Sequence, residues 1–522
     1  MLAVVGLFAV VVLVREVSRR IGFQEPIALL MVGVGFSFVP GIPSFAVEPD
    51  LVLMVVLPVL LYGAAFTTSV PSFRENLRSI GTLSIGLTLF TTAAVGFAAH
   101  AVIPDLSLAA GMVLGAVVAP QDAVAAVAIG RQAGMPRRAI TMLEGESLFN
   151  DAAALTAFQI AIAAVVGGSV SPWYASGRFL LATAGGLVVG AVVAFVLAWI
   201  RRRVDHPVAD AALSLLAPFL AYLPAEAVHG SGIVSVVVTG LYLGHRQPSV
   251  MSARSRLVAQ ATWEVIEYLL AGAVFVLIGL QASDLITGLR GESPGLVAIA
   301  CAVVVAVVIA TRLLWVFPDI YVPRWLNRGR QQPVPWQEVA IVGWAGLRGV
   351  VSVGAAFAIP RGAGGGEFPH RDLILFVTAV VIVSTLLLQG LTLPAVVRRW
   401  GPHSIHPDDR AAEHADQEVA AHNASADAGL ARLDELVAEQ HPPEAVVDRL
   451  RERADRRRML ASRASGADGE ADAEVYRRLR RDVLRAELEH LVRMRDDGEL
   501  DDEVFTKEQR ELDHEDSMLD RD

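Results

Sequence analysis

Residues 144–158, EGESLFNDAAALTAF, place acidic and polar side chains at the start of an apolar run. On a helix, Glu146 and Asn150 lie about 40° apart, and Ser147 and Asp151 are separated by the same angle, so the four form one polar stripe. Hydrogen bonding between helices would explain the serine and the asparagine, but not two acids. A carboxylate inside a bilayer costs at least about 2.5–3.5 kcal/mol and normally faces a cavity or a partner. This cost predicts a functional site, because such a carboxylate binds either a proton or a cation.

A third acid, Asp122, lies in the apolar segment GAVVAPQDAVAAVAIG at residues 115–130. Pro120 removes a backbone donor and interrupts a helix just before this acid. Gln121 adds a side-chain amide to the interruption. A helix that opens inside a membrane frees carbonyl groups and helix ends, from which transporters commonly build ion sites. Asp122 is therefore a second candidate for an ion site.

A basic residue, Arg348, lies in the similarly apolar segment VGWAGLRGVVSVGAAFAIP at residues 342–360. Glycines surround it at positions 343, 346, 349 and 354, and they predict a second weakened helix. Each break alone is equally consistent with close packing, because glycine and proline are frequent in membrane helices. Two breaks at corresponding places in the two halves of a transporter favour a binding site.

Composition places these residues in a membrane. The chain has 522 residues, of which 54% are hydrophobic, and its mean hydropathy is +0.50. Soluble proteins are nearer about 45–50% apolar. Apolar runs recur from residue 1 to residue 397, and several reach the roughly 20 residues that cross a bilayer. We predict an all-α membrane protein with about thirteen transmembrane helices near residues 1–14, 24–43, 50–69, 79–102, 106–129, 139–166, 178–200, 207–226, 230–244, 261–281, 294–317, 336–359 and 372–397.

The two breaks fall at equivalent places if the first six and the last six spans form two inverted repeats. The fifth span, 106–129, and the twelfth, 336–359, then correspond. We therefore expect two inverted repeats whose interrupted helices cross at the site.

Loop charge predicts the orientation of these spans. Loops after odd-numbered spans carry 19 arginines, whereas loops after even-numbered spans carry only Arg178, Arg290, Arg361 and Arg371. Positively charged loops stay in the cytoplasm. The N-terminus is therefore expected outside and the C-terminal tail inside.

The chain changes character near residue 400. Residues 401–522 hold 33 acidic and 19 basic residues, a net charge of −14, so the first 400 residues carry +4 of the total of −10. A linker, GPHSIHPDD, follows Trp400, and Val475, Leu479 and Val483 recur near helical spacing. We predict a transmembrane domain at 1–400 and an acidic, helical cytoplasmic tail at 401–522.

Other function classes fit the sequence less well. A channel more often has a repeated pore loop or a ring of acids, and a transporter of organic solutes usually adds aromatic or hydrogen-bonding groups. An enzyme would need a nucleophile beside a base or a metal motif, and neither is recognisable in the sequence. The single cysteine, Cys301, excludes a disulfide framework and a cysteine metal site.

Four segments together resemble the signature segments of a known family. They are EGESLFNDAAALTAF, APQDAVAAVAIG, FVLIGLQ at 275–281 and GLRGVVSVGAA at 346–356. They resemble the sodium/proton exchanger family of monovalent cation–proton antiporters, with its prokaryotic NhaP-type branch as the nearest match. The likeness covers most of residues 1–400, and the tail at 475–500 is similar to tails of bacterial members.

The resemblance implies roles for residues that match the family's motifs. Asp151 would carry the ion and the proton. Asn150 precedes it, as in the family's electroneutral branch, where electrogenic relatives have a second Asp. Asp122 would lie where the two unwound helices cross, and Ser147 would add a ligand oxygen. The cation ligands would then be Asp151, Asp122 and Ser147.

Two further roles concern the surroundings of this site. The resemblance implies that Glu146 and Arg348 form a buried ion bridge. The family's usual Thr-Asp-Pro is Gln121-Asp122-Ala123 here, with the proline at position 120. The backbone carbonyl of Gln121 would still serve the ion, and the different side chain at this position bears on ion selectivity.

The implied function is secondary active, electroneutral exchange of Na⁺, or else Li⁺ or K⁺, for H⁺ across the plasma membrane, which serves pH and cation homeostasis. A carboxylate that binds either ion at one site couples the two fluxes. The resemblance implies a homodimer in a lipid bilayer, with no cofactor, no enzymatic activity and no nucleic-acid partner. K⁺/H⁺ exchange as the main activity and a cation channel remain the alternatives.

Overall fold

The computed structural model divides into two compact units, Met1–Pro402 and His403–Asp522. It describes residues 2–40, 52–68, 70, 77–167, 172–204, 206–289, 292–326, 335–363, 366–400, 407–440, 442–452, 467–496, 508, 509, 512 and 515. Most of the predicted linker after Trp400 lies outside these residues.

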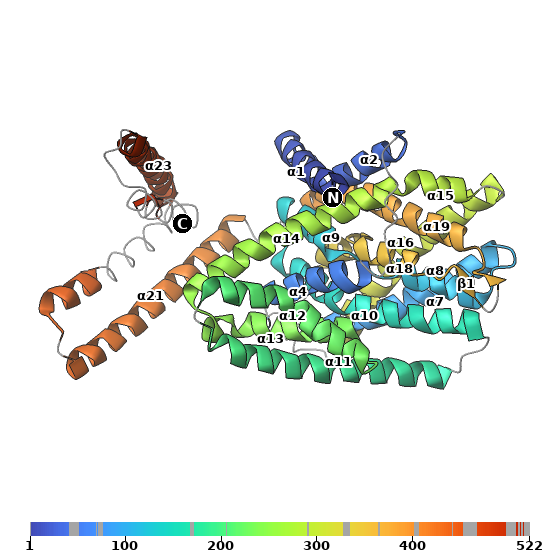
Figure 1. Cartoon of the computed structure of the whole chain (residues 1–522), viewed down its shortest axis with the longest axis horizontal. Coiled ribbons are helices and arrows are strands. Elements are labelled where there is room, and N and C mark those ends of the chain that lie inside the picture. The colour runs from blue at the N-terminus through green and yellow to red at the C-terminus, as the bar shows by residue number, and fades with distance from the viewer. Residues whose placement is uncertain are drawn as a thin grey trace. The chain divides into compact units, whose positions relative to one another are not determined.

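The first unit is helical apart from one short hairpin in its described residues (Figure 1). Three stretches, η1, η2 and η3, are π-helical. Its elements, in chain order, are α1 (Leu2–Ile21), α2 (Glu25–Ser37), η1 (Val52–Val56), α4 (Leu57–Thr67), α6 (Leu77–Gly81), η2 (Thr82–Leu87), α7 (Thr88–Val102), α8 (Leu108–Val118), α9 (Ala123–Gln132), α10 (Arg137–Gly167), α11 (Pro172–Arg201), α12 (Pro207–Ala227), α13 (Gly232–Val250), α14 (Ala253–Leu280), α15 (Ala282–Gly288), α16 (Pro294–Leu326), α17 (Trp336–Trp344), α18 (Val350–Phe357), β1 (Gly362–Ala363), β2 (Gly366–Glu367), α19 (Arg371–Thr385), η3 (Leu386–Gly390) and α20 (Leu391–Trp400).

Eight stretches of the described residues are long and apolar enough to cross a membrane, and two shorter apolar helices accompany them. The predicted spans 106–129 and 336–359 are each two helices, α8 with α9 and α17 with α18. Another difference is the start of α14, which begins at Ala253 instead of near 261. Ser252 explains it, because its hydroxyl accepts a bond from Ser255 N at 3.1 Å and caps the helix before the apolar run begins.

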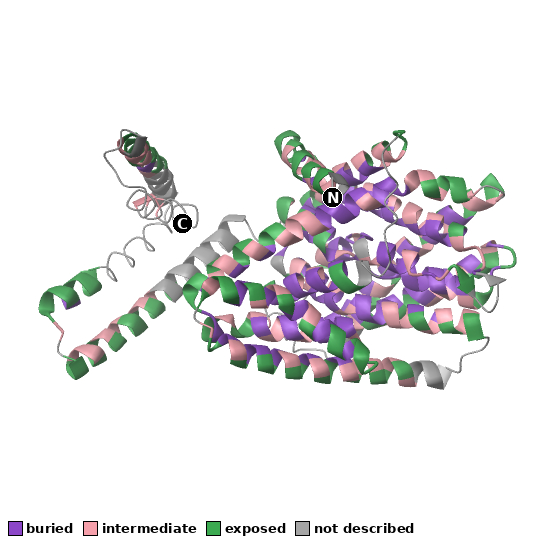
Figure 2. Cartoon of the chain, in the orientation of Figure 1, coloured by how far each residue is buried: buried purple, intermediate pink, exposed green. Residues whose placement is uncertain are grey.

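The buried apolar residues in the described part of this unit form three clusters. One contains residues of α7, α8, α16 and α19, and a second contains residues of α4, α11, α12 and α13. The third contains residues of α2, α9, α14, α17 and α20. Small residues permit the closest approaches: a Cβ on Gly279 of α14 would lie 2.4 Å from the carbonyl oxygen of Leu30 in α2. Buried residues therefore run through the interior of the unit (Figure 2).

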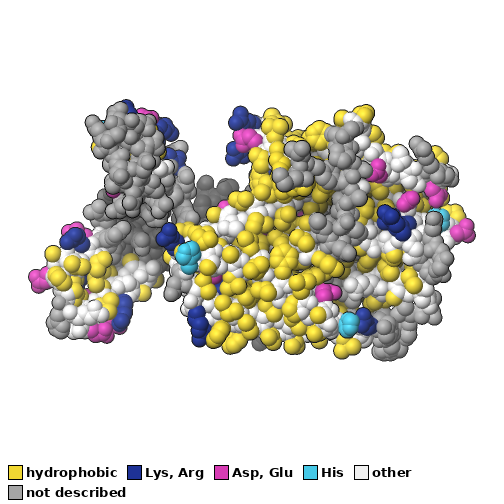
Figure 3. Space-filling model, in the orientation of Figure 1, with side chains coloured by type: hydrophobic (Ala, Val, Ile, Leu, Met, Phe, Trp, Pro, Cys, Tyr) yellow, Lys and Arg dark blue, Asp and Glu magenta, His cyan; other side chains and the backbone are white. Residues whose placement is uncertain are grey.

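The surface of the first unit is apolar. Hydrophobic side chains cover most of its visible face (Figure 3). On α11 several large side chains are more than half exposed, among them Leu181 at 72% and Phe195 at 65%. A soluble protein seldom exposes so large an apolar patch, whereas a lipid-facing helix does so by necessity.

The second unit contains two long helices, α21 (Pro407–Gln440) and α23 (Ala467–Asp496). This unit has salt bridges on its surface. Arg451 contacts Asp434 at 2.8 Å, and Arg480 contacts Glu515 at the same distance. The Arg480 guanidinium lowers the pKa of Glu515 by this hydrogen bond. Its helices are predominantly polar, in keeping with the composition of residues 401–522.

Candidate functional site

The first helix break lies between α8 and α9, at residues 119–122, where the chain is not helical. Asp122 ends the break as the N-cap of α9, and its Oδ1 accepts from the backbone N–H of Val124 at 2.9 Å and of Ala125 at 3.4 Å. An acid at this position complements the positive end of the helix dipole. The interruption predicted from Pro120 is therefore confirmed.

The second break, at residues 345–349, meets the first one. The backbone N–H of Asp122 donates to the carbonyl of Leu347 at 2.9 Å. Gly349 lies against the Asp122 carboxylate so closely that a Cβ at this position would be 1.8 Å from Oδ2. Only glycine fits there. This close contact explains why position 349, one of the four glycines around Arg348, is a glycine.

Arg348 is fully buried and bonds to helix ends. Its Nε donates to the carbonyl of Val118 at 2.7 Å, in the last turn of α8, and its Nη1 donates to that of Gly346 at 2.8 Å. A cation at the carboxyl end of α8 offsets the negative end of that helix dipole. Arg348 thus ties the second break to the first interrupted helix.

The predicted ion bridge between Glu146 and Arg348 is wrong in its basic partner. Arg312 of α16 pairs with Glu146 instead: Nη1 lies 2.9 Å from Oε1 and Nη2 lies 3.2 Å from Oε2. Both side chains are about 1% exposed. Arg312 also donates to the carbonyl of Val342 near the end of α17, at 2.8 and 3.1 Å. The two arginines therefore bind the carboxyl ends of different interrupted helices: Arg348 binds that of α8 and Arg312 binds that of α17.

Arg312 is absent from the site predicted from sequence. It lies inside the predicted span 294–317, in a helix that is otherwise almost wholly apolar. A buried arginine in a membrane helix is by itself a signal for a functional or structural partner. That signal was available without the structure.

Gln121 connects the first break to the polar stripe of α10. Its Nε2 donates to Oε1 of Glu146. Its backbone carbonyl accepts from Asn150 Nδ2 at 3.2 Å and from Ser147 Oγ at 3.4 Å. The structure therefore brings Gln121, Glu146, Ser147 and Asn150 together, with the Ser147 hydroxyl and the Gln121 carbonyl bonded to each other.

Asp151 is the buried acid with the fewest bonds in this cluster. It is 1% exposed, and its Oδ1 has no hydrogen-bond partner among the described residues. The Oδ1 of Asn150 is likewise buried and has no hydrogen-bond partner within that part of the chain. Buried polar oxygens are normally satisfied, so two neighbouring exceptions mark a place where a proton or a cation can bind.

The stripe offers the chemistry that a hard cation requires. Carboxylate, amide, hydroxyl and carbonyl oxygens are the ligands such cations prefer. Asp151 supplies one negative charge, whereas Asn150 is neutral and Glu146 is neutralised by Arg312. The arrangement therefore suits one singly charged ion or one proton.

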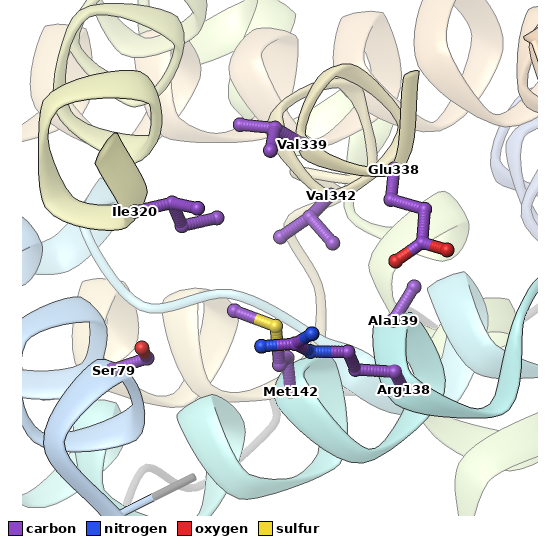
Figure 4. A pocket seen from close by; sticks show the side chains of 8 residues that line it. All are labelled: Ser79, Arg138, Ala139, Met142, Ile320, Glu338, Val339 and Val342. Carbon is purple, nitrogen blue, oxygen red and sulfur yellow. The ribbon is translucent and has the colours of Figure 1, made fainter. Parts of the chain in front are cut away.

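A pocket opens beside this cluster, at the ends of α6, α10, α16 and α17 (Figure 4). Arg138 and Glu338 are its charged lining residues. Its lining also includes Val342, whose carbonyl holds Arg312, and Met142, which precedes Glu146 by one helical turn. The pocket thus lies next to the ion pair, while Asp151 is not among its lining residues.

Three comparisons with known proteins agree, because each one finds sodium/proton exchangers or antiporters. The family model for the transmembrane sodium/hydrogen exchanger matches residues 6–399. An uncharacterized Na⁺/H⁺ exchanger of Mycobacterium tuberculosis is 35% identical over 531 residues, which cover 99% of this chain and 96% of the relative. A sodium, potassium, lithium and rubidium/H⁺ antiporter of Bacillus pumilus is 32% identical over 409 residues, covering 75% of this chain and 60% of the relative. The fold is similar to that of the sodium proton antiporter MjNhaP1 of Methanocaldococcus jannaschii, with a TM-score of 0.63, 19% identity, and coverage of 76% of this chain and 98% of that one.

Proposed function

Because this chain belongs to the sodium/hydrogen exchanger family, we propose that it exchanges a monovalent cation for a proton across a membrane and that Asp151 carries both ions. Members of the family are secondary transporters and not enzymes. The single observation that carries our assignment of the site is the Asp151 carboxylate, which is buried with one oxygen that lacks a hydrogen-bond partner in the described residues.

Competition between a proton and a cation for one carboxylate is sufficient to couple the two fluxes. When Asp151 holds a proton, it no longer attracts a cation, and when it holds a cation, it cannot also hold a proton. An empty, charged carboxylate costs free energy inside a membrane, so the unloaded site crosses poorly between the two sides. Net exchange follows if the loaded site is exposed to each side in turn.

We propose Na⁺ as the transported cation, with Asp151, Asp122 and Ser147 as ligands and Asn150 and Gln121 beside them. Li⁺ and K⁺ are the alternative cations, since the Bacillus relative is named for four alkali cations. K⁺/H⁺ exchange is thus the alternative reading. Proteoliposomes that contain a pH-sensitive dye test the choice: the cation that is transported should drive proton efflux when it is added outside. An internal pH that stays unchanged with every alkali cation would refute the proposal.

Thirteen spans in two inverted repeats are part of the same proposal. Support comes from the two breaks at residues 119–122 and 345–349, which lie in the fifth and the twelfth of the predicted spans. From the arginine distribution we further propose that the N-terminus is outside and that residues 401–522 form the cytoplasmic tail of a plasma-membrane protein. Such a chain is expected to assemble as a homodimer.

The stoichiometry is expected to be one proton per cation. Asn150 is neutral at every relevant pH, and Glu146 is held by Arg312 at 2.9 Å, so Asp151 is the only carrier in the stripe. A transporter that moved one net charge would gain about 2.3 kcal/mol per 100 mV. Electroneutral exchange gains nothing from a membrane potential.

Proteoliposomes clamped with valinomycin and K⁺ measure this directly when Na⁺ or Li⁺ drives transport. Initial rates should remain constant as the potential is swept. A severalfold change in rate would indicate a second carrier and would contradict the role given to Asn150.

A further inference from the structure

The side chain of Gln121 occupies a position that the transport mechanism above does not use. It is 6% exposed, and its amide donates to the same oxygen, Oε1 of Glu146, that Arg312 binds at 2.9 Å. This end of Gln121 is therefore attached to an ion pair that is itself fixed to the end of α17 through the carbonyl of Val342. A residue anchored in this way has little freedom to rotate.

The peptide unit between Gln121 and Asp122 links three elements. Its carbonyl accepts from Ser147 and Asn150 of α10, at 3.4 and 3.2 Å. Its N–H donates to Leu347 in the second break at 2.9 Å. One peptide plane thus joins the first break to α10 on one side and to the second break on the other.

The carbonyl oxygen of this peptide is bonded to Asn150, the residue next to the carrier Asp151. Both of its lone pairs are engaged, so a cation that uses this oxygen must compete with the hydroxyl of Ser147 and the amide of Asn150. Which cation competes best depends on how firmly the carbonyl is held. An oxygen at a fixed position favours one ionic radius, whereas a mobile oxygen adapts to several.

We infer that Gln121 is a positioning residue: its side-chain amide, by bonding to Glu146, fixes the Gln121 carbonyl and so sets how well the site distinguishes Na⁺, Li⁺ and K⁺. The inference rests on the proposed function, since it needs a cation site at Asp151. It assigns the side chain of Gln121 a role in selectivity without direct contact with the ion.

The test replaces Gln121 with Met, which keeps the length of the side chain and removes the amide. Half-saturating concentrations of Na⁺, Li⁺ and K⁺ are measured by dye-monitored proton flux at one pH. The ratio between the preferred and the poorest cation should fall by about threefold or more, in line with the loss of one buried hydrogen bond. Maximal rates should change less than this ratio, because the carrier Asp151 is untouched.

The matched control is Ser235→Ala in α13. It also removes a buried side-chain hydrogen bond, from Ser235 Oγ to the carbonyl of Ala221 at 2.7 Å, but far along the chain from the site residues. Both variants should lose thermal stability, whereas only Gln121→Met should lose selectivity. A selectivity ratio equal to that of the wild type in Gln121→Met would overturn the inference.

A Gln121→Met protein that folds but does not transport can still be examined. The concentration of each chloride salt that gives half of its maximal thermal stabilisation in detergent reports binding, with choline chloride as the ionic-strength control. Gln121→Thr serves in both measurements if the Met variant fails to fold, with the same expected loss. Absence of cation-dependent flux in the wild type would instead contradict the proposed function itself.

Discussion

The Asp151→Asn protein is expected to lose cation-dependent proton flux completely when it is reconstituted into liposomes. Asparagine has nearly the same shape, but it neither takes up a proton nor offers a negative charge to a cation. The Oδ1 of Asp151 accepts no hydrogen bond in the described residues, so the replacement breaks no existing bond at that atom. Expression and thermal stability should therefore remain close to those of the wild type.

A matched acid-to-amide control lies on the same helix. Glu144 contacts Arg131 at 2.7 Å and is 30% exposed, and it stands outside the polar stripe. The Glu144→Gln protein should transport at nearly the wild-type rate. Substantial antiport by Asp151→Asn, at rates comparable with this control, would remove Asp151 from the role of carrier.

The second large effect is expected at the ion pair between Glu146 and Arg312. Removal of one partner from a buried pair leaves an uncompensated charge and typically costs about 3–5 kcal/mol. Glu146→Ala and Arg312→Ala should each lower the unfolding temperature in detergent strongly. The double variant should lose less than the sum of the two, because neither charge is then left without its partner.

Arg348 provides the comparison for this cycle. It donates to backbone carbonyls of Val118 and Gly346, and within the described residues it makes no hydrogen bond to Glu146. The coupling between Glu146 and Arg348 should therefore be smaller than that between Glu146 and Arg312. Strict additivity in the Arg312 cycle, together with strong coupling in the Arg348 cycle, would restore the pairing that the family resemblance implies.

An all-helical membrane fold with an interrupted helix at Pro120 could be predicted from sequence because its causes are local. Hydropathy over about 20 residues is sufficient to find a membrane helix, and Pro120 interrupts one regardless of its neighbours. The acids at positions 122, 146 and 151 were recognisable for the same reason, since a charge in an apolar run is costly wherever the helix packs.

The pairing of side chains could not be predicted with the same success. The sequence offers Glu146 two arginines, Arg312 in α16 and Arg348 in the second break, and helical spacing within α10 says nothing about which one lies opposite. Arg312 and Arg348 both serve carboxyl ends of interrupted helices, so their roles look alike in sequence. The choice depends on how the other elements pack around α10, which is a long-range property of the fold.

The bonds of Gln121 are a second example. The family resemblance implies that its carbonyl serves the ion and that Ser147 supplies a ligand oxygen. In the structure these two groups bond to each other at 3.4 Å. Hydrogen bonds between a break in one helix and the stripe of another depend on the rotation of both elements, which no local pattern records.

Uphill cation transport by the wild-type protein tests the central claim, proton-coupled exchange, most directly. Proteoliposomes are loaded at acidic pH and diluted into an alkaline buffer that contains radioactive Na⁺, with the membrane potential clamped at zero. The account predicts that the outward proton gradient drives Na⁺ inward until its internal concentration exceeds the external one, and that a protonophore abolishes the excess. A Na⁺ flux that stops at equal concentrations, and that the proton gradient leaves unchanged, would identify a channel and contradict the account.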